Sequence, residues 1–178
     1  MSTEKAEVKD MSKGNVIVYY GDGKGKTTSA LGYAIQAASQ GRSVIIIQFL
    51  KGKNDDEMAF IRRLEPEIKF FRFEKSHENF ELLSEEQKAE EIMNIKNGLN
   101  FARKVLLTGE CSVLILDELL GLIDNHVISN DELDAMLQAK SEETEIIFTG
   151  REMDASLSQY ADEIYEIHTE KSGIDKNL

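Results

Sequence analysis

A glycine-rich stretch near the start of the chain has the composition of a phosphate-binding loop. Residues 21–28 read Gly-Asp-Gly-Lys-Gly-Lys-Thr-Thr, after an apolar run and before a segment of helical character. An anion needs several N–H donors that converge on it, and a backbone curls that tightly where glycine removes the Cβ clash. A helix N-terminus adds unpaired N–H groups and partial positive charge. The stretch therefore predicts a nucleoside triphosphate site, and we expect ATP.

The other side chains of this loop suit the same ligand. Lys26 can reach the phosphates as a mobile cation, the Thr27 hydroxyl can ligate Mg²⁺, and Lys24 adds a second positive charge. The usual pattern G-x-x-x-x-G-K-[ST] has glycine where this chain has Tyr20, so the loop is a variant. A glycine-rich turn without a ligand is the alternative, which the flanking strand and helix disfavour. The residues expected to contact the nucleotide are Gly21, Asp22, Gly23, Lys24, Gly25, Lys26, Thr27 and Thr28.

Two adjacent carboxylates, Asp117 and Glu118, follow another apolar run. A strand that ends in acid places it at the carboxyl edge of the sheet, where open α/β folds bind ligands. Beside the loop, these carboxylates would hold Mg²⁺ directly or through water. A strand that simply runs into an acidic turn is the alternative. We expect Thr27, Asp117 and Glu118 to form the metal site, and Lys26, Thr27 and Glu118 to be the catalytic residues.

The remaining reactive side chains favour structural roles. His77, His126 and His168 show no metal-ligand spacing with one another or with Cys111, so a zinc site is not expected. Cys111 precedes a predicted strand, which favours a small, partly buried residue over a nucleophile.

The elements that must position the site alternate between β-rich runs and helical segments. The alternation predicts an α/β fold with a mostly parallel sheet of about six strands and helices on both faces. Ser84 and Gln87 have the spacing of a capping box at the start of the longest helix. Strands are expected at 15–20, 43–48, 68–73, 112–116, 145–149 and 163–167, and helices at 26–40, 84–108 and 130–140, with short ones before residue 64 and between the last two strands.

Length and charge limit the classes of protein. The chain has 178 residues, one cysteine and a formal net charge of −12, which disfavours a broad nucleic-acid surface and a disulfide framework. No apolar run approaches the ~20 residues that span a bilayer, and residues 1–13 lack the apolar core of a secretory signal. We expect a cytoplasmic protein with a flexible segment at 1–14, a nucleotide-binding domain at 15–168 and a loose tail at 169–178.

The residue sequences of these motifs resemble those of the corrinoid adenosyltransferases of the ATP:cob(I)alamin type. Their loop reads G-N-G-K-G-K-T-T, with a non-glycine residue before it, as here. Four further segments are similar in the same order: Gln48-Phe49-Leu50-Lys51-Gly52 to Q-F-x-K-G, residues 114–119 to V-L-D-E-[LI], Thr149-Gly150-Arg151 to T-G-R, and residues 161–164 to A-D-x-[IV].

The resemblance implies a RecA-like P-loop fold and transfer of the 5′-deoxyadenosyl group from ATP to a Co(I) corrinoid, in the synthesis or salvage of adenosylcobalamin. It also implies a homodimer and an electron donor, such as a flavoprotein-like reductant. The nucleophile is the cobalt ion, so the protein needs no activated side chain. Roles implied by resemblance are metal binding for Glu118, charge neutralisation for Lys24, Lys26 and Thr27, and lining of the active-site mouth for Gln48, Lys51 and Arg151.

Two segments depart from the family pattern. After the third strand, relatives have a Gly-x-x-Phe-x-Trp-like loop near the lower face of the corrinoid. Here Phe80 matches the Phe, Leu82 replaces the Trp and the glycine is absent. We expect Phe80 and Leu82 to point to one side of an extended loop and to form an apolar wedge against the corrinoid. The family's C-terminal segment is shortened in this chain.

Two other functions are compatible with these motifs. One is an ordinary P-loop ATPase or small-molecule kinase, in which Glu118 orients water or an acceptor hydroxyl. The other is a protein that binds ATP or a corrinoid without catalysis. The products distinguish the three: triphosphate, ADP plus phosphate, or none.

Overall fold

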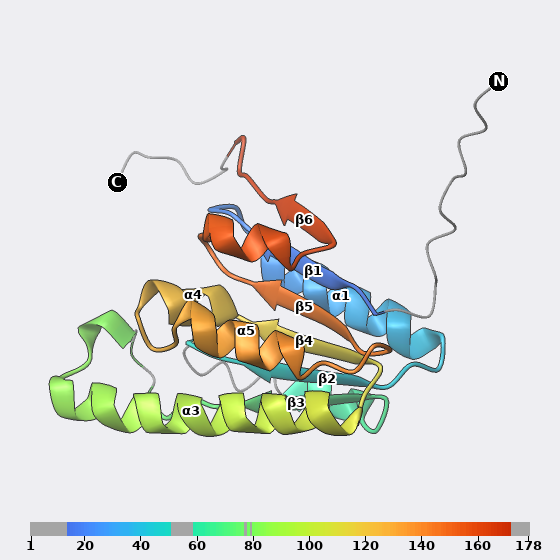
Figure 1. Ribbon diagram of the computed structural model, residues 1–178, viewed down its shortest axis with the longest axis horizontal. Coiled ribbons are helices and arrows are strands. Elements are labelled where there is room, and N and C mark those ends of the chain that lie inside the picture. The colour runs from blue at the N-terminus through green and yellow to red at the C-terminus, as the bar shows by residue number, and fades with distance from the viewer. Residues whose placement is uncertain (1–13, 51–58, 77, 79, 172–178) are drawn as a thin grey trace.

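A parallel sheet forms the centre of the computed structural model, which describes residues 14–50, 59–76, 78 and 80–171 (Figure 1). Six strands of the described chain pair in the order β3-β2-β4-β5-β1-β6, and every pair is parallel. The strands are β1 (Val16–Tyr20), β2 (Val44–Gln48), β3 (Ile68–Arg72), β4 (Val113–Asp117), β5 (Glu145–Thr149) and β6 (Glu163–Glu166).

The burial of the central strands explains why their sequences are continuous apolar runs. Every residue of β2, β4 and β5 is buried, because helices cover both faces of a parallel sheet and leave no face to water. In contrast, β6 at the sheet edge is mostly exposed. The predicted six strands and their parallel arrangement are confirmed.

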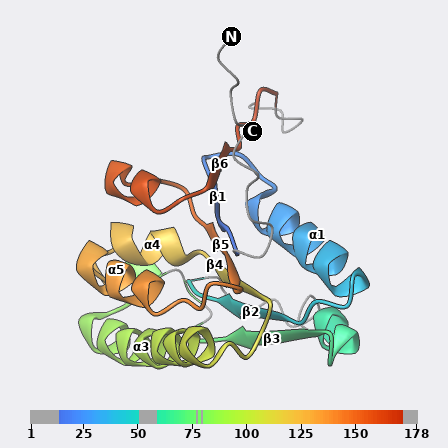
Figure 2. The ribbon, with the colours of Figure 1, turned by 45° about the vertical axis from the view of Figure 1, so that its right-hand side comes forward.

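Helices pack on both faces, as expected. On one face α1 (Lys26–Ser39) buries Ala30, Ala34 and Ala37 against the sheet. The opposite face carries α3, α4 and α5, which lie together in Figures 1 and 2. Their bounds are α3 (Glu85–Thr108), α4 (Leu119–Asp124) and α5 (Asn130–Gln138), and short 3₁₀ turns are η1 (Arg62–Leu64), η2 (Phe80–Leu82) and η3 (Ala155–Gln159).

The start of α3 forms as its sequence predicts. The Ser84 side chain accepts a hydrogen bond from the Gln87 N–H, and the Gln87 side chain accepts one from the Ser84 N–H. Ile95, Ala102 and Leu106 on this helix are fully buried. A second capping box joins Ser129 and Glu132 at the start of α5. The short helix α4 was not expected from the sequence.

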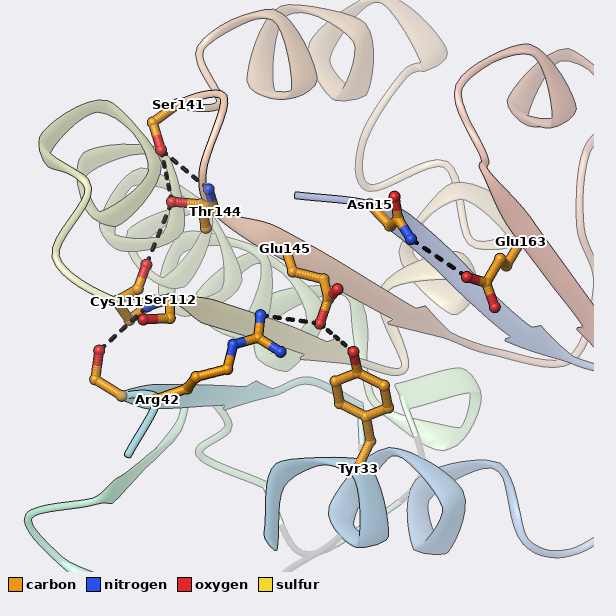
Figure 3. Close-up of polar contacts among 10 residues, drawn as sticks. Asn15, Tyr33, Arg42, Cys111, Ser112, Ser141, Thr144, Glu145 and Glu163 are labelled. Atoms are coloured by element: carbon orange, nitrogen blue, oxygen red, sulfur yellow. Dashed lines mark hydrogen bonds and ion pairs between the residues drawn. The ribbon is translucent and has the colours of Figure 1, made fainter. Parts of the chain in front are cut away.

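Polar contacts tie the elements together at the amino edge of the sheet, away from the phosphate loop (Figure 3). Glu145, at the start of β5, accepts hydrogen bonds from the Tyr33 hydroxyl of α1 and from Arg42. The pKa of Tyr33 is raised to about 12, mainly by burial and to a smaller extent by the hydrogen bond to Glu145. Thr144 links this edge to the Cys111 carbonyl.

No helix among the described residues combines the length and the apolar character that a membrane crossing requires.

Candidate active site

The predicted phosphate loop joins the end of β1 to the start of α1. Gly25, just before α1, has a φ of 116°, which glycine adopts without steric strain. Gly21 also has a positive φ, 120°, as a tight turn of glycine predicts, and a further constraint applies to Gly21 and Gly23. A Cβ atom on Gly21 would lie 2.4 Å from the Ile167 carbonyl oxygen, and one on Gly23 would lie 2.6 Å from it. The chain after β6 therefore fits against the loop only because these two residues have no side chain.

Backbone hydrogen bonds hold this loop from two sides. The Gly21 N–H donates to the Arg151 carbonyl over 2.9 Å, and the Gly23 N–H donates to the Ile167 carbonyl over 2.8 Å. These two N–H groups therefore fix the shape of the loop. The amides at the N-terminus of α1 are the groups suited to an anion, because the first-turn N–H groups of a helix have no acceptor within that helix.

Lys26 folds back across the loop. Its Nζ donates to the Gly21 carbonyl at 2.7 Å and to the Gly23 carbonyl at 2.8 Å, and the residue is 8% exposed. The ammonium group is thus held over the glycine-rich turn. This is the position from which a cation can neutralise bound phosphates.

Asp117, at the end of β4, is the polar centre of the site. It is 1% exposed. Its Oδ1 accepts from the Thr27 hydroxyl at 2.9 Å and from the Thr149 hydroxyl at 2.7 Å, and its Oδ2 accepts from Gln48 Nε2 at 2.7 Å. The structure thus joins the loop threonine to the acidic strand end, as the sequence predicts. It also shows that Gln48 contacts Asp117.

Arg72 was missed by the sequence interpretation. As the last residue of β3, it donates from Nε and Nη2 to Gln48 Oε1 over 2.9 and 2.6 Å. A single charged residue at a strand end gives no motif, and only the strand register, in which Gln48 pairs with both Arg72 and Asp117, reveals the contact.

Glu118 is the N-cap residue that precedes α4, and it has a left-handed conformation with a φ of 62°. Its N–H donates to the Thr149 hydroxyl at 2.8 Å, which in turn donates to Asp117. Thr149 therefore connects the two acidic residues of the predicted metal site. Non-glycine residues at positive φ are uncommon, and they concentrate at functional sites.

The other predicted site residues lie around the loop or outside the described chain. Lys24 and Thr28 are exposed. Asp22 lies 3.5 Å from His168 Nδ1. Arg151 has an exposed side chain, and its carbonyl contacts the loop. Lys51 lies outside the described residues, as does His77.

The expectation of an extended loop at Phe80 and Leu82 is wrong. The two residues form the 3₁₀ turn η2, in which residues two apart point in directions roughly 120° apart, because the turn has about three residues. Phe80 packs against the core cluster, whereas Leu82 is 73% exposed. They therefore do not form one contiguous surface in this structure.

Cys111 is buried, and burial raises the pKa of its thiol to about 12. It precedes β4 and so lies at the opposite edge of the sheet from Asp117. A thiol that holds its proton so firmly is a poor nucleophile at neutral pH.

The donor groups at the loop fit Mg²⁺. A hydroxyl and carboxylate oxygens meet beside the loop, and Mg²⁺ commonly uses one or two carboxylates together with water and substrate phosphates. No cluster of three or more His, Cys, Asp or Glu side chains among the described residues suits a metal, so a metal here would require oxygen ligands from the nucleotide and water.

A solved structure shares this fold. The flagellar accessory protein FlaH from Methanocaldococcus jannaschii aligns with a TM-score of 0.57 and 15% identity, over 87% of this chain and 71% of that chain. Such a likeness supports the fold alone. Together with the strand order and the loop after β1, it identifies a RecA-like P-loop fold.

Sequence relatives point to one family. A protein of Pseudomonas aeruginosa named corrinoid adenosyltransferase is 28% identical over 95% of this chain and 83% of its own length. The corrinoid adenosyltransferase CobA of Salmonella typhimurium is 27% identical, over 93% of this chain and 82% of its own length. The profile of the family described as ATP:corrinoid adenosyltransferase BtuR/CobO/CobP matches residues 12–178. The chain therefore belongs to the ATP:corrinoid adenosyltransferase family, whose members are enzymes that act on ATP and corrinoids.

Proposed function

We propose that this enzyme transfers the 5′-deoxyadenosyl group of ATP to the Co(I) ion of a corrinoid and releases inorganic triphosphate, in the synthesis or salvage of adenosylcobalamin. The observation that carries the proposal is the contact between Thr27 and Asp117, together with a lysine, Lys26, held at the same loop, in a chain of this family. That arrangement suits a nucleoside triphosphate, and membership of the family favours transfer of the adenosyl group over hydrolysis.

The reaction requires the protein to position its substrates and does not require a reactive side chain. A Co(I) corrinoid supplies an electron pair that attacks C5′ of the ribose. The Co–C bond forms, the C5′–O bond breaks, and the triphosphate departs with that bonding pair. The protein has to hold C5′ in line with the cobalt and stabilise charge on the leaving group. The burial of Cys111, which raises the pKa of its thiol, agrees with a mechanism that needs no protein nucleophile.

Individual residues divide this work. Lys26, held across the loop by two carbonyl groups, would exchange these contacts for phosphate oxygens. Thr27, Asp117 and Glu118 would hold Mg²⁺, which would neutralise negative charge on the triphosphate. Gln48 would act on this site through Asp117, and Lys24, Lys51 and Arg151 would meet the nucleotide from the mouth of the site.

The corrinoid would bind beside η2. Phe80, which is half-buried, and Leu82, which is exposed, are the apolar residues of the turn itself. Although they point in different directions, we assign each of them to the lower face of the corrinoid. By family resemblance, we further propose a cytoplasmic homodimer that obtains its electrons from a flavoprotein-like reductant.

Product analysis tests the proposal. The full-length protein is incubated with Mg·ATP and chemically reduced cob(I)alamin, and both products are identified by phosphorus NMR and by the visible spectrum of the corrinoid. Adenosylcobalamin and triphosphate in equal amounts are expected. ADP and phosphate would instead indicate a kinase or ATPase, and an unchanged mixture would indicate a binding protein.

A further inference from the structure

Three polar residues form a row across the carboxyl edge of the sheet. The register pairs Gln48 of β2 with Arg72 of β3 on one side and with Asp117 of β4 on the other. Hydrogen bonds follow the same row: Arg72 donates twice to Gln48 Oε1, and Gln48 Nε2 donates to Asp117 Oδ2. The guanidinium is thereby linked to the residue that contacts the loop threonine.

The chemistry of the row gives it a direction. A side-chain amide has an accepting and a donating end, whereas a guanidinium only donates and a carboxylate only accepts. Arg72 therefore takes the carbonyl end of Gln48 and leaves the NH₂ group for Asp117. With the amide reversed, an oxygen would face the carboxylate and NH₂ would face the cation, so both contacts would be repulsive.

Burial makes this orientation matter. Gln48 and Asp117 are each 1% exposed, so bulk water does not readily replace a lost hydrogen bond. The two bonds from Arg72 are charge-assisted, which makes them stronger than bonds between neutral groups. The cation also lies 5.8 Å from the centre of the Phe70 ring, so a purely packing role for Arg72 is the competing explanation.

We propose that Arg72 is a positioning residue of the nucleotide site. It fixes the amide of Gln48, and the amide holds the Asp117 carboxylate in the orientation that receives Mg·ATP. This inference rests on the Mg·ATP site of the proposed function, but not on adenosyl transfer. Arg72 is two strands away from Asp117 and acts without touching the nucleotide.

Calorimetric titration with ATP, in excess Mg²⁺ and separately in EDTA, tests the proposal. The proteins are the wild type, Arg72→Met, Gln48→Met and the double variant, with Arg62→Met as a control because Arg62 is exposed on η1. We expect Arg72→Met to weaken Mg·ATP binding by roughly 5- to 30-fold, the range for a change of one or two kcal/mol. Metal-free ATP should bind equally well to both proteins.

The double variant tests whether Arg72 acts through Gln48. If it does, Arg72→Met should add nothing to Gln48→Met, since residues in one network show non-additive effects. Arg72→Lys retains a cation beside Phe70 but provides one nitrogen in place of two. Arg72→Lys should lose part of the Mg·ATP affinity. If Arg72→Met does not fold, Arg72→Lys replaces it in the comparisons with the wild type and with Gln48→Met.

Failure of this inference differs from failure of the proposed function. Absence of Mg·ATP binding by the wild type would reject the nucleotide site itself. With a wild type that binds, unchanged affinity in Arg72→Met or Arg72→Lys would overturn the positioning role. Equal losses with and without Mg²⁺ would mean direct contact with the nucleotide, and additive losses would mean that Arg72 does not act through Gln48. Either result would also overturn it.

Discussion

The Thr27 hydroxyl lies 2.9 Å from Asp117 Oδ1, although 90 residues separate the two in sequence. Thr27 lies in the first turn of α1, which packs against β4, the strand that ends at Asp117. The strand that leads into the loop, β1, is separated from β4 by β5. The contact closes over the end of β5, where the Thr149 hydroxyl donates to the same carboxylate oxygen. The nucleotide loop and the acidic strand end are therefore joined through side chains of three elements.

Replacement of Lys26 should separate nucleotide binding from folding. We expect Lys26→Ala to weaken ATP binding about 10- to 150-fold, since a charge-assisted contact contributes roughly 1.5–3 kcal/mol. Calorimetry measures the affinity and circular dichroism verifies the fold. Lys69→Ala, which removes an exposed lysine of β3, is the control. Equal affinities for Lys26→Ala and the control would refute the assignment of the loop.

Thr149→Val should destabilise the protein, although the substitution changes the side-chain volume little. Thr149 is fully buried, and its hydroxyl accepts from the Glu118 N–H and donates to Asp117. Loss of the acceptor for a buried N–H costs about 1–3 kcal/mol. Urea unfolding measures the change, with Thr108→Val as the control because Thr108 is exposed at the end of α3. Coincident unfolding curves for Thr149→Val and the wild type would contradict the prediction.

Phe80→Ala should affect the corrinoid more than the nucleotide. A ligand on the lower face of a Co(II) corrinoid pushes electron density onto the metal, and an apolar side chain that displaces the ligand eases reduction. We expect unchanged ATP binding and a rate reduced roughly tenfold, or about 1.4 kcal/mol of barrier, from Co(II) with a mild reductant. The loss should be smaller from preformed Co(I).

Leu82→Ala is the matched variant, because Leu82 is 73% exposed and its truncation should not disturb the core. It should reproduce the same preference for Co(I) without loss of thermal stability. Equal rate losses from both cobalt states in Phe80→Ala would show that Phe80 is only a core residue.

The contact between Tyr33 and Glu145 should make stability depend on alkaline pH. The pKa of Tyr33 is raised to about 12 from its ordinary value of 10.0, mainly by burial and by the Glu145 contact. A raised pKa stabilises the fold below pH 10, and this contribution is lost as the pH rises toward 12. Denaturant unfolding between pH 9 and 12 should therefore show a steeper decline for the wild type than for Tyr33→Phe. Parallel declines would exclude the contribution.

Cys111 should be inert in the folded protein. Its thiol is buried and its pKa is raised to about 12 by loss of solvation, whereas alkylating reagents attack the thiolate. Mass spectrometry after iodoacetamide treatment at pH 8 should find no modification in the native state and complete modification in urea. Rapid labelling of the native protein would contradict the burial.

Much of the fold was predictable because its signals are local. Continuous apolar runs identified the buried parallel strands, and the Ser84 capping box identified the start of α3. The helix α4 escaped notice because its six residues are nearly all apolar and show no periodicity. Phe80 and Leu82 were assigned an extended backbone because spacing alone does not separate a strand-like loop from a 3₁₀ turn.

The chemistry of the site was predictable where a motif carries it, as at Lys26, Thr27 and Asp117. Arg72 was not, because its partner depends on the register between β2 and β3. Gly21 and Gly23 were identified, but not the carbonyl of Ile167 that requires them, since that approach is a tertiary contact between opposite ends of the chain.

The support of the loop by late segments affects how the site arises during protein synthesis. β1 pairs with β5 and β6, and the loop donates hydrogen bonds to the Arg151 and Ile167 carbonyls. A ribosome releases the glycine-rich stretch long before these partners exist. The nascent chain thus carries the complete motif before the later strands and carbonyl groups that fix the shape of the loop have been made. We expect ATP affinity to arise only once the last strand has docked, so that a chain truncated before β6 retains the motif and loses the site.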